Sequence, residues 1–141
     1  MTYDTIDDAF QFVSDAPPGE RMALVHRQSG QVFLASAKAG YDQRPAGWES
    51  DPDCLRIPHR QEIDPGKPLL LDFIRQNCPG ELARVEGLFG RPGAFRNIKD
   101  LLRRKQLLAS WQVFEGQQLE ARLRQWCAAQ GLSLEKGVVP G

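Results

Sequence analysis

The spacing of apolar residues changes along the chain, from every second position before a segment rich in proline and glycine to helical spacing after it. In residues 21–36, Ala23 and Val25 alternate with Leu24, as strands require. Five of the ten prolines fall within residues 37–68, which favours extended loop there. Apolar residues after this segment recur every three or four positions. This order predicts an α+β fold, with a small antiparallel sheet built on an N-terminal hairpin and packed against about four mainly C-terminal helices.

The N-terminal part, residues 5–36, predicts a helix followed by a hairpin. Thr5 and Asp8 have the spacing of a capping box, so a helix is expected over residues 5–15. Two strands then pair around a turn that ends at Gly30, because glycine adopts the positive φ that such a turn requires.

Residues 37–67 form the predicted loop. Residues 54–57 are expected to add a third strand, because an isolated hairpin is only marginally stable in water. His59 is the polar residue of this loop that most readily reaches a cleft between the loop and the helices. An exposed loop histidine is the alternative interpretation.

Residues 68–134 predict the helical part of the fold. One helix is expected to begin near Gly93 and to turn Phe95 inward. Residues 107–116 are expected to form a connection, after which a last amphipathic helix closes the fold.

The length of 141 residues suits one domain. We expect an α+β domain over residues 1–134 and a mobile tail over residues 135–141, which lack periodicity. The first residues are acidic where a secretory signal is basic, and no apolar run approaches the roughly 18 residues of a membrane span. The three cysteines are odd in number and far apart, which suits reduced thiols. A cytoplasmic protein without membrane contact is therefore expected.

The formal net charge of zero conceals an uneven distribution of charge. Residues 1–64 contain 6 basic and 11 acidic residues, whereas residues 90–141 contain 9 basic and 4 acidic residues. Neutrality of the whole chain excludes a diffuse polycation. The basic part either pairs with the acidic part across the fold or faces an acidic partner.

Basic residues concentrate around the start of the helix near Gly93. Two glycines and a proline precede this helix, whose first backbone N–H groups carry a partial positive charge. These N–H groups and the neighbouring Arg and Lys side chains together predict a binding site for an anion. A solvated amphipathic face, whose first turn needs glycine, is the alternative. The predicted binding residues are Arg91, Gly93, Arg96, Lys99, Arg103 and Trp111.

Trp111 and Phe114 allow two interpretations. Aromatic residues beside basic ones can stack on bases, as they do in proteins that bind single strands. A pair of aromatic residues in an apolar stretch can instead close a core, and the preceding residues 107–110 are mostly apolar.

Motifs for catalysis or metal binding are absent from the sequence. The two histidines, His26 and His59, are 33 residues apart and belong to no Cys-x-x-Cys or His-x-x-x-His pattern. Asp51 and Asp53 lack the ligand count of a dedicated cation site. We therefore expect no catalytic residue, no metal and no cofactor.

Residues 90–100 follow the pattern Gly-[basic]-x-Gly-Ala-Phe-Arg-x-[apolar]-Lys-Asp and precede a Trp-x-x-Phe element at residues 111–114 and Trp126. This succession resembles the uncharacterised bacterial protein family UPF0158. The resemblance implies an α+β fold over most of residues 5–134 and implies no activity, because the family is defined without one. The chain departs from the family at residues 26–27, His-Arg, where an acidic residue commonly precedes the hairpin turn. A role for that carboxylate is therefore not carried over.

The leading interpretation is a non-enzymatic binding or regulatory module. Its basic surface would contact an acidic ligand, either a protein surface or a nucleic acid. The competing interpretation is a small enzyme or small-anion sensor, with a phosphate or carboxylate near Gly93 and with His59 or Asp100 transferring a proton. A structural subunit with an exposed apolar patch is the third possibility.

Overall fold

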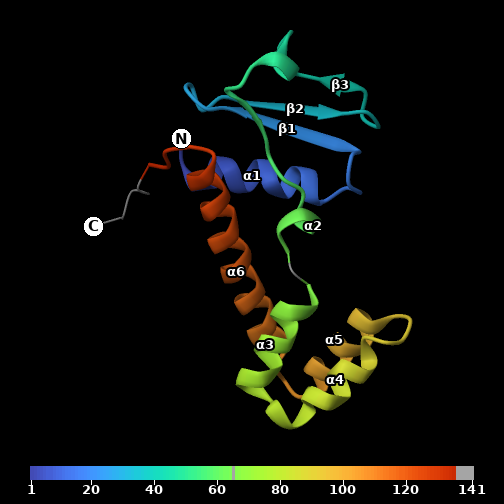
Figure 1. The fold of residues 1–141 in the computed structure, drawn as a ribbon. Coiled ribbons are helices and arrows are strands. Elements are labelled where there is room, and N and C mark those ends of the chain that lie inside the picture. The colour runs from blue at the N-terminus through green and yellow to red at the C-terminus, as the bar shows by residue number, and fades with distance from the viewer. Residues whose placement is uncertain (65, 136–141) are drawn as a thin grey trace. The chain divides into compact units, whose positions relative to one another are not determined.

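The computed structural model describes residues 1–64 and 66–135, and it confirms the predicted α+β class (Figure 1). In chain order the elements are α1 (Tyr3–Ser14), β1 (Arg21–His26), β2 (Val32–Ser36), β3 (Tyr41–Asp42), η1 (Trp48–Ser50), β4 (Cys54–Arg56), α2 (Arg60–Ile63), α3 (Lys67–Asn77), η2 (Pro79–Glu81), α4 (Leu82–Leu88), α5 (Ala94–Arg104) and α6 (Leu108–Ala129). Contacts divide the chain into two compact units, Met1–Asp64 with Ala121–Gly141 (unit 1) and Pro65–Glu120 (unit 2). Residues 136–141, which belong to the predicted tail, lie outside the described residues.

The sheet has four antiparallel strands in the order β3-β2-β1-β4. Val25 of β1 faces Val32 of β2 on one side and Leu55 of β4 on the other, which confirms the predicted hairpin and the predicted third strand. The two-residue strand β3 adds an edge on β2, in a segment predicted as loop. A strand of two residues leaves no alternation for sequence analysis to detect.

Helix α1 begins two residues earlier than predicted. Thr2 is its N-cap, and the Thr2 side chain accepts a hydrogen bond from the backbone N–H of Thr5 at 3.4 Å. Thr5 therefore lies inside the helix, and the capping box predicted at Thr5 and Asp8 is wrong. The polar side chain that reaches the free N–H groups of the first turn belongs to Thr2 instead.

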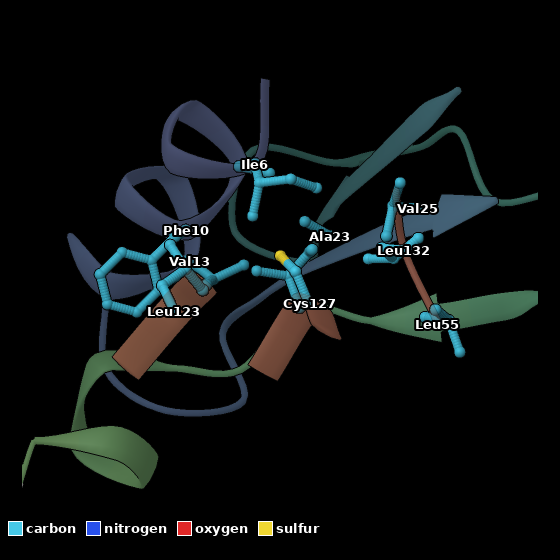
Figure 2. Close-up of a cluster of buried hydrophobic side chains, with 11 residues drawn as sticks. Ile6, Phe10, Val13, Ala23, Val25, Leu55, Leu123, Cys127 and Leu132 are labelled. Atoms are coloured by element: carbon cyan, nitrogen blue, oxygen red, sulfur yellow. The ribbon is translucent and has the colours of Figure 1, made fainter. Parts of the chain in front are cut away.

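The core of unit 1 lies between α1, the sheet and the last turns of α6 (Figure 2). Ile6 and Phe10 of α1 belong to the same buried cluster as Ala23 and Val25 of β1. Apolar residues from the C-terminal end complete it, namely Leu123, Cys127 and Leu132. Burial of this surface stabilises unit 1 because it removes apolar area from water.

The core of unit 2 joins α3, α4, α5 and the first turns of α6. Phe73 links α3 to α6 in this core, because its ring lies 5.5 Å from the rings of both Trp111 and Phe114. The connection predicted at residues 107–116 is wrong, since α6 begins at Leu108 and continues through Gly116. Leu108, Trp111 and Phe114 of that stretch pack into the core from a helix rather than from a loop.

Phe95 of α5 lies at the surface of unit 2. Phe95 is 49% exposed, so its predicted inward orientation is wrong; its ring packs edge-on against Phe89 at 5.4 Å.

Of the helices in the described part of the chain, none combines the length and the apolar character that crossing a membrane requires.

Candidate functional site

Helix α5 carries three of the six predicted binding residues, Arg96, Lys99 and Arg103, on its outer face. The helix begins after Gly93, whose φ of 72° lies in the left-handed region that glycine adopts without strain. Gly93 offers no side-chain cap to the first N–H groups of the helix. Ile98, Leu101 and Leu102 are buried on one side, which leaves the polar side chains to solvent.

The outer face of α5 holds Arg96, Lys99 and Arg103, which are all exposed, and we call these three residues the basic face. The Arg103 guanidinium donates to Asp100 at 2.8 Å. Asp100 thus relieves charge repulsion at Arg103. In the described residues, no acidic side chain lies within ion-pair distance of Arg96, Lys99 or Arg91.

The surroundings of the basic face leave its positive charge largely uncompensated. Residues 82–105 contain seven basic and two acidic residues. Glu81, just before them, is shared between two cations, with Lys105 Nζ at 3.3 Å and the Arg84 guanidinium at 3.8 Å. Surface charge of this density raises the local concentration of anions.

A cleft of about 550 Å³ lies beside the basic face, between α4 and α5. We call it the α4–α5 cleft. Its lining residues are Arg84, Leu88, Asn97, Asp100, Arg103 and Arg104. Of the predicted binding residues, Arg103 lines this cleft, whereas Arg91, Gly93, Arg96 and Lys99 do not. The predicted set therefore does not converge on one concavity.

Most residues that line the cleft are not among the predicted binding residues, although their helical spacing gives a signal for them. Asn97, Asp100 and Arg104 are spaced i, i+3 and i+7, which places them on one flank of α5. Arg84 and Leu88 are spaced i and i+4 on α4. Helical spacing predicts which residues share a face on α4 and which share a face on α5. Only the fold shows that these two faces lie against the same cleft.

Trp111 belongs to the core and not to the binding surface. Its side chain is 5% exposed and packs edge-on against Phe73. Stacking of Trp111 on a base would require unit 2 to open, so its place among the predicted binding residues is wrong. The core interpretation of Trp111 and Phe114 is confirmed.

His59 is a buried capping residue. Its Nδ1 atom accepts from the backbone N–H of Gln61 at 3.0 Å, and its Nε2 atom lies 2.8 Å from the carbonyl oxygen of Ala16. The cavity that His59 lines measures about 70 Å³. That volume is far below the roughly 300 Å³ of small ligand pockets, so the cleft predicted at His59 offers no room for a substrate.

Glu62 completes the structure around His59. Its carboxylate accepts from the backbone N–H of His59 and pairs with the Arg56 guanidinium at 2.7 Å. The hydrogen bond from Arg56 lowers the pKa of Glu62, and the bond from His59 adds to this effect. These groups cap α2 and tie it to β4.

His26, Asp51 and Asp53 lie together at the turn end of the hairpin, with one potential ligand atom from each within 4.8 Å of the others. The Arg27 guanidinium already donates to Asp53 at 2.7 Å. The Nδ1 atom of His26 accepts from the backbone N–H of Gln28 at 3.2 Å, which puts the proton of the neutral ring on Nε2. A proton on one nitrogen and an N–H donor at the other suit a structural turn better than metal coordination.

Cys54 lies next to this group. Its Sγ atom donates to Asp51 Oδ2 at 3.7 Å. Burial raises the pKa of the Cys54 thiol, and the negative charge of Asp51 raises it further. A thiol that stays protonated is a poor nucleophile and a poor metal ligand.

Comparisons of this chain with protein-family models, with curated proteins and with solved structures give no match in any of the three cases.

Proposed function

We propose that this chain is a cytoplasmic, non-enzymatic binding or regulatory module, which contacts an acidic ligand through the basic face of α5 and the preceding loop at residues 90–93. The ligand is a nucleic acid or an acidic protein surface. The observation that carries the proposal is the absence, in the described residues, of an acidic partner for Arg91, Arg96 and Lys99. Exposed cations without partners remain available to an external anion.

Binding is better supported than catalysis by the position of His59, one of the two candidate proton-transfer groups. A general acid or base must be within reach of a substrate proton. Both ring nitrogens of His59 are instead engaged by backbone groups. Membership of the UPF0158 family is likewise a proposal, which rests on residues 90–100.

A binding assay with two matched triple variants tests the proposal. Fluorescently labelled single-stranded DNA, single-stranded RNA, duplex DNA and poly-glutamate serve as probes at low salt. The variant Arg96→Ala/Lys99→Ala/Arg103→Ala removes the basic face. The control Lys38→Ala/Arg75→Ala/Arg122→Ala removes the same charge from exposed positions elsewhere.

Loss of binding in the first variant with retention in the control supports the proposal, provided that circular dichroism gives the same helix content for both. Equal binding by the two folded variants overturns it, and so does the absence of binding to all four probes by the unaltered chain.

A further inference from the structure

We infer that the α4–α5 cleft takes one nucleotide of a single-stranded nucleic acid, with a neighbouring phosphate on its arginines and the edge of the base on Asp100. This inference rests on the proposed function and narrows its ligand to one class. The cleft volume of about 550 Å³ falls within the range of pockets that hold small organic groups. All of its named lining residues belong to unit 2.

The arginines of the cleft supply donors for phosphate. Arg104 has no ion-pair partner among the described residues, and Arg84 is 3.8 Å from Glu81, which is beyond hydrogen-bond distance. A guanidinium carries five N–H donors in a planar fork that matches phosphate oxygens. Arg103 uses one nitrogen on Asp100 and keeps the rest of its fork.

Asp100 and Asn97 distinguish nucleic acid from an acidic peptide. Asp100 is a hydrogen-bond acceptor within a basic cleft. Its negative charge repels the carboxylates of an acidic peptide, and those carboxylates have no hydrogen to donate to it. A base offers donors: cytosine presents its N4 amino group where thymine presents the O4 acceptor. Asn97 adds a carboxamide, and Leu88 adds an apolar contact for a ring. The edges of unpaired bases are accessible in single strands, so a single strand is favoured over a duplex as the ligand.

The sharpest test compares oligo(dC) with oligo(dT) of equal length by fluorescence anisotropy. Both bases are pyrimidines with opposite groups at position 4, and thymine differs further by its C5 methyl group. We expect the unaltered chain to bind oligo(dC) about fivefold more tightly, which is the scale of one good polar contact to a base edge. In Asp100→Ala the ratio falls to about one, while affinity for oligo(dT) stays the same or rises because a negative charge is lost.

Glu86→Ala is the matched control, because it removes an exposed acidic charge of α4 that does not line the cleft. This variant is expected to keep the preference for oligo(dC). The same two variants are also compared with oligo(rC) and oligo(rU), because uracil has the same O4 acceptor as thymine. A preference for cytosine that depends on Asp100, with either deoxyribose or ribose, supports the inference.

The inference and the proposed function fail separately. If oligonucleotides bind but the ratio is near one, or if Asp100→Ala keeps the preference, the cleft does not read a base and only the inference is overturned. Competition by poly-glutamate as effective as competition by oligo(dC) also overturns it and assigns the surface to an acidic protein. No binding to any polyanion overturns both.

Discussion

The Nε2 atom of His59 lies 2.8 Å from the carbonyl oxygen of Ala16, a residue 43 positions earlier in the chain. Because Nδ1 of the same ring accepts from the backbone N–H of Gln61, the ring proton is on Nε2 and is donated to Ala16. One neutral imidazole therefore satisfies a carbonyl just after α1 and an N–H in the first turn of α2. This bond fastens the segment after α1 to the start of α2.

Replacing His59 with alanine is expected to destabilise the chain by about 1–3 kcal/mol, since an N-cap is lost and a buried carbonyl is left without its donor. Urea unfolding followed by circular dichroism measures this change. The exposed neighbour Gln61→Ala is the control, and its effect is expected to stay within about 0.5 kcal/mol. Equal effects of the two substitutions would contradict a capping role for His59.

The ion pair between Glu62 and Arg56 makes stability depend on pH in a defined direction. The hydrogen bond from Arg56 lowers the pKa of Glu62 below its ordinary value of 4.5. A lowered pKa gives stability that is complete above this value and is lost as the pH falls through the pKa of the folded state. Glu62→Gln is therefore expected to be less stable than the unaltered chain at pH 7, and the difference is expected to shrink below about pH 4.5. Urea titrations at several pH values measure it; a difference that grows on acidification contradicts the assignment.

Asp51 is expected to protect the Cys54 thiol from alkylation. Its charge adds to the effect of burial on the pKa of Cys54, and Asn at this position keeps the size while removing the charge. Asp51→Asn should thus speed the reaction of Cys54 with iodoacetamide at pH 8, as measured by peptide mass spectrometry. Cys78 serves as the internal control, because burial and Glu81 raise the pKa of its thiol independently of Asp51. An unchanged rate at Cys54 would exclude the proposed effect of Asp51.

Trp111→Ala is expected to cost about 3–5 kcal/mol, because it removes a large buried side chain from the core of unit 2. Val113→Ala, at a position that is 60% exposed on the same helix, should cost less than about 0.5 kcal/mol. Thermal and urea unfolding compare the two. A stable Trp111→Ala variant that loses oligonucleotide binding would instead support base stacking by this residue.

Local patterns were sufficient for the sheet and insufficient for α6. Alternation from Ala23 to Val25 and a glycine at the turn predict the hairpin, because both properties are local to the chain. The start of α6 is not specified by local pattern, because an apolar stretch containing Trp111 and Phe114 fits both a connection that closes the core and the first turns of a helix. Their burial beside Phe73 in a continuous helix depends on contacts between distant segments.

The same limit explains the candidate site. Basic residues on α5 follow from helical spacing, and their exposure agrees with it. The cleft depends on Arg84 of α4 lying beside Asn97 and Arg104 of α5, which periodicity within each helix does not specify. The bond between His59 and Ala16 has no sequence signal for the same reason, since no local pattern links two residues that are 43 positions apart.

The salt dependence of oligonucleotide binding tests the role of the basic face most directly. The logarithm of the association constant for a single strand should fall linearly with the logarithm of the salt concentration. The size of this slope is about 0.7 per phosphate contact. Arg96→Ala/Lys99→Ala/Arg103→Ala is predicted to reduce the slope by about 2, whereas Lys38→Ala/Arg75→Ala/Arg122→Ala leaves it unchanged. Equal slopes for the two variants would contradict a ligand-binding role for the basic face of α5.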